Sequence, residues 1–280
     1  MEAIVGIFEK NWQGFLMGAL MTMLVALLGT IFGSVIGLMI GVVRTIPVKK
    51  PSKKAASAMV VPKKGFKAIV KALSLRLRFF FVNIFIPYAK YFLQKAINTI
   101  LTVYIEVFRG TPMIIQSVVI FYGFAEWFNW HMDVVFAGIL IVSINTGAYM
   151  SEIVRGGINA IDKGQFEAAH AIGMSHRQTM FNIILPQTIR NILPATSNEF
   201  VINIKDTAVL NVIGLSELFF KTKGIWGKNY LFYQTAIIAC VIYFILTFIT
   251  TRALRLLEKK FRGSESYTLQ DSRTRHRRGI

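Results

Sequence analysis

Cysteine is almost absent from this sequence, and a nucleotide-binding motif is missing altogether. The single cysteine, Cys240, excludes an intrachain disulfide and a metal site built from several cysteine ligands. The phosphate-binding pattern G-x-x-x-x-G-K-[ST] does not occur, and the stretch "GIWGKN" at 224–229 has neither its spacing nor its hydroxyl residue. We therefore expect the chain to bind no nucleotide, metal or other cofactor by itself.

Charged residues are missing from three long stretches, at 11–43, 134–151 and 231–251. About 20 helical residues cross the hydrocarbon core of a bilayer, so apolar runs of roughly 18 or more residues are candidate spans. The sequence thus predicts an all-α integral membrane protein.

Acidic residues are scarce at two places where basic residues gather. Between Arg44 and Lys90 there are 12 Lys or Arg and no acid, and from Arg252 onward 9 basic residues accompany 3 acidic ones. Such a surplus can indicate nucleic acid, but in a membrane protein Lys and Arg are biased toward the cytoplasmic side. We expect a basic cytoplasmic insertion at about 45–90, either an interfacial helix or a solvated linker, and a basic cytoplasmic tail at 257–280.

These anchors fit about five transmembrane helices. Residues 1–13 would form an external N-terminus, followed by a transmembrane domain at 14–256. The predicted spans are 14–43, about 93–128, about 134–154, one that starts near Ile192, and 231–251.

Two features complicate this topology. Gly110 and Pro112 in "FRGTP" predict a break within the second span, because both residue types interrupt a helix. The loop at 218–230 contains three lysines and yet would lie outside, against the usual orientation bias.

Glycines recur at every fourth residue of the first span, at Gly29, Gly33, Gly37 and Gly41. This spacing gives one helix face with almost no side chains, which lets another helix approach closely. We predict a helix-packing face there.

Residues 162–186 are polar and Ala-rich, unlike the spans around them. Asp162 with Gln165, and Ser175 with Gln178, have the spacing of helix capping boxes. The segment is therefore predicted to form a pair of short helices.

The ends of these helices are also marked. Gly173 is placed to end the first helix in the left-handed conformation, and Pro186 is expected to stop the second. Each helix would have about ten residues, too few to span a bilayer. The pair has some features of a DNA-binding helix-turn-helix, but the apolar flank of its second helix and its direct link to a span favour docking on a cytoplasmic protein.

The helix pair resembles the cytoplasmic loop of the membrane permease subunits of ABC importers. The family pattern is EAA, three residues, G, nine residues, I, one residue, LP. It is matched here by Glu167-Ala168-Ala169, Gly173, Ile183 and Leu185-Pro186. The flanks "YIEVFRGTPMIIQ", "GAYMSEIVRGGINAIDKGQFEAA" and "NEFVINIKDTAVLNVIGLSEL" are similar to the polar amino-acid branch.

The resemblance implies a type I ABC importer permease fold in a bacterial cell membrane, with the C-terminus in the cytoplasm. It implies a dimer of ATPase subunits that hydrolyses ATP, a second permease subunit, an external solute-binding protein and an amino-acid substrate, so the chain itself would be no enzyme. The ATPase-coupling contact would fall on Glu167, Ala168, Ala169, Gly173, Leu185 and Pro186.

Polar residues inside the predicted spans are candidates for a substrate pathway, because such groups are costly in lipid. They are Gln116, Asn145, Glu152, Glu199, Lys205 and Asp206. Lys205 and Asp206 are adjacent and point about 100° apart on a helix, so each needs another partner or water. Glu152 can instead pair with Arg155 as surface ions. Two other functions stay open: a membrane-anchored DNA-binding regulator and an ion-driven transporter that works without ATP.

Overall fold

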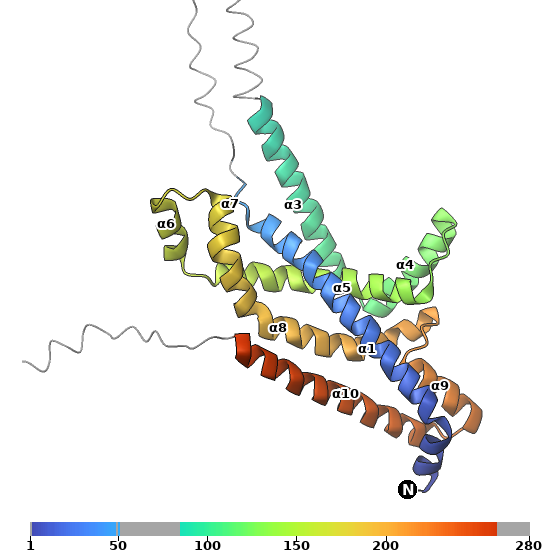
Figure 1. The fold of residues 1–280 in the computed structure, drawn as a ribbon. Helices are drawn as coiled ribbons and strands as arrows, with labels where there is room; N and C mark the ends of the chain where they lie inside the picture. Colours follow the sequence, from blue (N-terminus) through green and yellow to red (C-terminus); the bar gives the residue numbers. More distant parts are fainter. Residues whose placement is uncertain (1, 49, 51–84, 262–280) are drawn as a thin grey trace, which may run out of the picture. The chain divides into compact units, whose positions relative to one another are not determined.

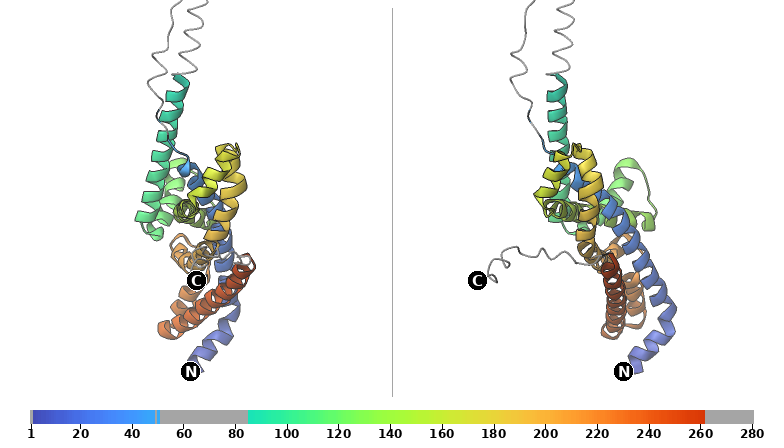
Figure 2. Two further views of the ribbon diagram at one scale, coloured as in Figure 1. Left: turned by 90° about the vertical axis from the view of Figure 1, so that its left-hand side faces the viewer. Right: turned by 60° about the vertical axis from the view of Figure 1, so that its left-hand side comes forward.

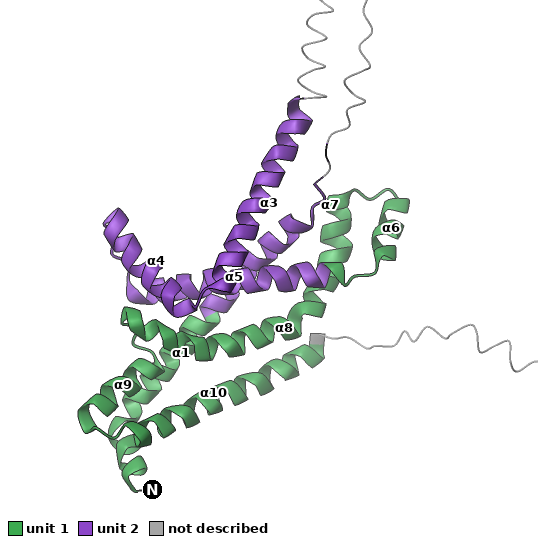
Figure 3. Cartoon of the chain, turned by 180° about the vertical axis from the view of Figure 1, so that it is seen from behind, with its two compact units in different colours: residues 1–27, 159–280 green, residues 28–158 purple. Residues whose placement is uncertain are grey.

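The computed structural model describes residues 2–48, 50 and 85–261, and within these ranges every regular element is a helix (Figure 1). Most of the predicted insertion at 45–90 and of the tail at 257–280 lies outside the described residues. The chain divides into two compact units, formed by residues 1–27 with 159–280 and by residues 28–158 (Figure 3). We describe each unit by itself.

The unit of residues 28–158 contains four helical segments. They are the second part of α1 (Glu2–Thr45), α3 (Ile86–Gly110), α4 (Met113–Phe128) and α5 (Val134–Asn159). α3 and α4 are bent by 116° at the short break between them, which confirms the predicted interruption at "FRGTP".

The other unit holds the first part of α1 and all elements after α5. These are α6 (Lys163–Ala171), α7 (His176–Thr179), the π-helix η3 (Met180–Ile184), α8 (Leu185–Asp206), the 3-10 helix η4 (Thr207–Ile213), α9 (Leu218–Asn229) and α10 (Phe232–Phe261). α8 and α10 run side by side in opposite directions (Figures 1 and 2).

Among the described residues, α1, α5 and α10 are long and apolar enough to cross a membrane, and α3 and α4 pass the same test together, as a broken span or a re-entrant loop. The protein is therefore a multi-pass membrane protein. The predicted span near Ile192 corresponds to α8, which is 22 residues long but carries Arg190, Glu199, Lys205 and Asp206 and is not apolar enough to qualify as a span. A fifth crossing there stays a prediction.

α1 is longer than the sequence predicted. It begins at Glu2, so residues 2–13, expected to precede the first span, are helical. Its 44 residues correspond to about 66 Å of helix, about twice the thickness of a hydrocarbon core. One end or both must extend beyond the bilayer.

The glycine stripe of α1 lies directly against α5. An added Cβ at Gly33 would lie 2.6 Å from Thr146 Cβ, and one at Gly41 would lie 2.6 Å from Val154 Cγ1. Gly29 and Gly37 face Val142 and Met150 in the same way. Because a real Cβ cannot approach this closely, only glycine permits the observed distance between the helix backbones.

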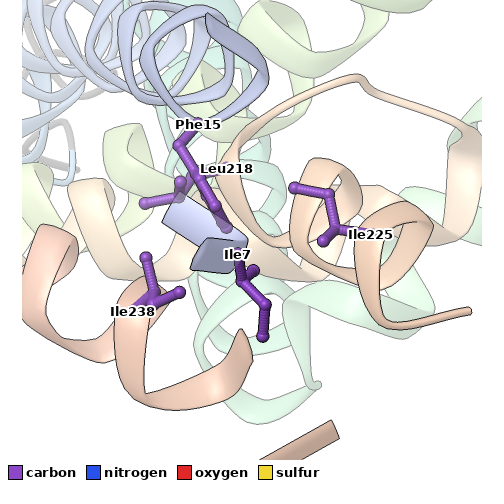
Figure 4. Packing of buried hydrophobic residues seen from close by; sticks show 5 residues of the cluster. All are labelled: Ile7, Phe15, Leu218, Ile225 and Ile238. Carbon is purple, nitrogen blue, oxygen red and sulfur yellow. The ribbon is translucent and has the colours of Figure 1, made fainter. Parts of the chain in front are cut away.

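The unit of residues 1–27 and 159–280 is held by a small apolar core between α1, α9 and α10. Figure 4 shows Ile7 and Phe15 of α1 beside Leu218 and Ile225 of α9 and Ile238 of α10. All five side chains are at most 9% exposed. The core thus fixes α9 against the beginning of α1.

Candidate functional site

α6 is a short helix closed at both ends by its own sequence. The side chain of Asp162 accepts a hydrogen bond from the Gly164 amide at 2.6 Å. At the other end Gly173 has φ +83°, its amide donates to His170 O, and the Met174 amide donates to Ala169 O. These two bonds form a Schellman motif, for which a left-handed glycine is the usual residue. Gly173 thus ends α6 as predicted.

The exposed surface of α6 and of the turn after it carries three of the predicted coupling residues. Glu167, Ala168 and Gly173 are exposed, whereas Ala169 is buried against the protein itself. Next to Gly173, the side chain of Ile172 is 77% exposed. This places an exposed apolar side chain beside the small residues of the predicted coupling contact. The sequence pattern had not singled out Ile172, because only the fold decides which side of the turn is exposed.

The second helix of the predicted pair begins after Ser175, as predicted, but continues beyond Pro186. Ser175 and Gln178 form the complete capping box at the start of α7, which confirms that prediction. The expectation that Pro186 ends the helix is wrong, because residues 176–206 are helical without interruption.

The π-helix η3 explains why proline is tolerated there. The Leu185 amide donates to Met180 O, five residues back, so the hydrogen-bond register shifts just before the proline. Pro186 then lies in the first turn of α8, the part of an α-helix in which proline is best tolerated. Leu185 is buried and Pro186 is exposed.

Gln116 closes the break between α3 and α4. Its amide nitrogen donates to Phe108 O, Thr111 O and Thr111 Oγ1, each at 2.9 Å. Its amide oxygen accepts from Asn145 Nδ2 on α5 at 2.9 Å. Carbonyls at a helix end have no partner within the helix, and in a membrane they need one. Gln116 and Asn145 therefore stabilise the broken span, and a substrate contact by either stays a prediction.

Glu152 lies between two arginines. It accepts from Arg44 at the end of α1, and from Arg155 Nη2 at 2.6 Å, which confirms the predicted pair with Arg155. All three side chains are partly exposed. The ion pair between Arg44 and Glu152 therefore connects the end of α1 to α5 within one unit.

The three candidates on α8 belong to the other unit. Lys205 and Asp206 are exposed at its end, and Glu199 lies about two turns earlier. The structure gives no arrangement that joins them to Gln116, Asn145 and Glu152.

Glu217 is a buried carboxylate that the sequence analysis overlooked. It is fully buried and caps the N-terminus of α9, accepting from the amides of Phe219 and Phe220 at 2.8 and 2.6 Å. The Tyr243 hydroxyl of α10 donates to it at 2.8 Å. Burial raises the pKa of the Glu217 carboxyl, and these hydrogen bonds oppose the rise. No simple signal marked this residue, since glutamate is not a common N-cap.

A cationic hollow lies between α1 and α9. It has a volume of about 370 Å³ and is lined by Lys10 of α1, by Lys221 and Lys228 of α9, and by the amides of Asn11 and Gln13. Lys223 lies on the same helix but donates to Asn211 Oδ1 at 3.0 Å instead. The sequence placed three lysines in this loop. It could not show that Lys10, more than 200 residues earlier, joins two of them.

Residues 84–263 match the family described as "Binding-protein-dependent transport system inner membrane component". An arginine transport system permease protein, ArtQ of Bacillus subtilis, is 37% identical over 162 residues, which is 58% of this chain and 74% of that protein. The glutamine transport system permease protein GlnP of Escherichia coli is 36% identical over 166 residues, 59% of this chain and 76% of its own.

Solved structures have the same fold. An amino acid ABC transporter crystallised with histidines has a chain that is 30% identical and superposes with a TM-score of 0.68, covering 90% of this chain and 96% of its own. The methionine ABC transporter MetNI in an inward-facing conformation, at 17% identity, has a TM-score of 0.62 over 90% of this chain and 98% of its own.

Proposed function

Since the chain belongs to the family of binding-protein-dependent transport system inner membrane components, we propose that it forms half of the translocation pathway of an ATP-driven importer for amino acids. The observation that carries this proposal is the family match over residues 84–263, together with relatives named as permeases for arginine, glutamine and cystine. The DNA-binding regulator and the ion-driven transporter find no support among these relatives. A second permease subunit and ATPase subunits are the partners that the fold implies.

Reconstituted transport tests the proposal. Proteoliposomes that contain the permease, its ATPase and its solute-binding protein are expected to accumulate a radiolabelled polar amino acid only when ATP is present inside. A panel that includes arginine, glutamine, histidine and cystine identifies the substrate. Uptake of the same size without the ATPase would contradict the proposal and favour an ion-driven transporter.

The coupling role belongs to α6 and the turn after it. The exposed patch of Glu167, Ala168, Ile172 and Gly173 contains one charged residue, and α6 is capped at both ends. Small residues let a partner approach closely, and a rigid element can transmit a displacement into α8 through the uninterrupted helix 176–206. We place the ATPase contact there and thus on the cytoplasmic side, with the C-terminus, and the N-terminus outside.

The cationic hollow between α1 and α9 is then on the external side, where a solute-binding protein would dock. Lys10, Lys221 and Lys228 make no ion pair within the described residues, so an acidic patch on that protein is a complementary partner. The core of Figure 4 and the buried Glu217 hold α9 in place, which keeps the hollow in a fixed shape.

Charge reversal in this hollow is expected to weaken delivery of substrate. Lys221→Glu with Lys228→Glu should lower the association rate of the solute-binding protein by about tenfold at low salt, because steering between opposite charges becomes repulsion. Stopped-flow binding at several ionic strengths measures the effect. Lys223→Glu is the matched control, since Lys223 lies on the same helix outside the hollow. Equal losses in the control and the double variant would contradict the docking site.

A further inference from the structure

A groove between α8 and α10 combines apolar walls with a surplus of positive charge. It consists of two adjoining hollows of about 240 and 300 Å³ that share the side chains of Val201, Thr251 and Arg255. Its apolar wall includes Phe244 and Phe248 of α10. Both helices belong to the same unit and lie side by side (Figures 1 and 2).

Three cationic side chains line the groove: Lys205 from α8, and Arg252 and Arg255 from α10. Arg252 lies with its Cζ 5.0 Å from the centre of the Phe248 ring, which restrains the guanidinium at the groove wall. Glu258 is the one carboxylate among the lining residues, and none of the three cations is within ion-pair distance of an acid in the described part of the chain. The residues that line the groove therefore carry three positive charges against one negative charge.

The place of these charges along α10 fits the edge of a bilayer. Residues 231–251 carry no charge, and Arg252 and Arg255 follow directly after them. Arg252 and Arg255 thus lie where the hydrocarbon region gives way to headgroups, and Lys205 lines the same hollow. Phe244 and Phe248 lie one to two turns deeper along the same helix.

We propose that this groove binds an anionic glycerophospholipid, with its phosphate at Arg252, Arg255 and Lys205 and an acyl chain along Phe244 and Phe248. Arginine suits a phosphate because its planar fork can donate two parallel hydrogen bonds to the oxygens. Basic pockets between transmembrane helices near the cytoplasmic surface are suited to anionic headgroups. A small soluble anion would leave the aromatic wall uncovered, whereas a lipid fills both parts of the groove. The proposal rests on α8 lying beside α10 in the membrane and on the cytoplasmic placement of the end of α10 under the proposed function, and it does not rest on the transported substrate.

Lipid retention by the intact complex tests the proposal. The permease is purified with its ATPase partner and placed in nanodiscs of phosphatidylcholine with phosphatidylglycerol. Native mass spectrometry then measures how much of each lipid stays bound to the complex. We expect the wild type to retain phosphatidylglycerol in preference to phosphatidylcholine. Arg252→Gln with Arg255→Gln should lower this preference about tenfold or more, because charge-assisted hydrogen bonds to the phosphate are lost.

Three comparisons make the result decisive. Arg190→Gln is the matched control, because Arg190 is an exposed arginine of α8 that does not line the groove, and it should retain the lipid as the wild type does. The pair Arg252→Lys and Arg255→Lys should keep most of the preference, because it keeps the charge. If the double glutamine variant does not assemble, the wild-type preference and the single variant Lys205→Gln provide the same test.

The proposal is overturned if the wild type retains both lipids equally, or if the glutamine variants keep the full preference. It is also overturned if glycerol 3-phosphate or inorganic phosphate displaces the bound phosphatidylglycerol. The concentration used is the one at which that anion, added without lipid competition, binds to the protein. Such competition would identify a site for a free anion and not for a lipid.

Discussion

Gly173→Pro is expected to leave the protein in the membrane and to abolish the ATP hydrolysis that the permease stimulates in its ATPase partner. Gly173 has φ +83°, and proline is restricted to about −65°. Proline also lacks the amide hydrogen that Gly173 donates to His170 O. The turn after α6 would have to open, and the exposed patch at Ile172 would lose its fixed direction. ATPase activity of the reconstituted complex, compared with that of the isolated ATPase, measures the loss.

Two milder substitutions at the same position serve as controls. Asparagine adopts the left-handed conformation more readily than other residues, so Gly173→Asn should keep most of the stimulation. Nothing lies within 4 Å of a Cβ added at Gly173, so Gly173→Ala tests the backbone conformation alone, at a cost of about 1–2 kcal/mol. Normal stimulation in the proline variant would contradict the coupling role of this turn.

Gly37→Leu is expected to separate α1 from α5 and to reduce the yield of folded protein sharply. A Cβ at this position would lie 2.8 Å from the backbone carbonyl carbon of Met150 and the backbone nitrogen of Ser151. Backbone atoms cannot move aside as a flexible side chain can, so the helix itself must shift. Overpacking of this kind costs about 1–3 kcal/mol. Thermal unfolding in detergent, followed by size-exclusion chromatography, measures the change.

Gly6 provides the comparison within the same helix. Nothing lies within 4 Å of a Cβ added there, so Gly6→Ala should be neutral or slightly stabilising, whereas Gly37→Ala should already be destabilising. Equal stability of the two alanine variants would show that the stripe does not determine how closely α1 packs on α5.

Local features of the fold could be predicted from the sequence because their causes are local. Uncharged runs are long enough to identify α1, α5 and α10, and Gly110 with Pro112 gives the break between α3 and α4. The capping box of Ser175 and Gln178 and the left-handed Gly173 also follow from short sequence patterns.

Features that depend on an irregular helix register or on distant residues could not be predicted. Pro186 normally indicates the end of a helix, and only the shifted register of η3 makes it compatible with a continuous one. The partners of Gln116 include a carbonyl eight residues earlier and a side chain on α5. The cap at Glu217 depends on Tyr243, 26 residues away, and the cationic hollow depends on Lys10. A sequence pattern does not show which of these residues the fold brings together.

The π-helical segment at Met180–Ile184 determines how the length of this stretch can vary. Removing one of its five residues would let it relax to an α-helix and rotate everything before it by about 100° relative to α8. The buried Thr179 would then leave its packing position, and α6 would turn with it. The nine-residue interval between Gly173 and Ile183 therefore sets the angle between the exposed side of α6 and α8. In a homologue with a shorter interval, the exposed side of α6 would face a different direction.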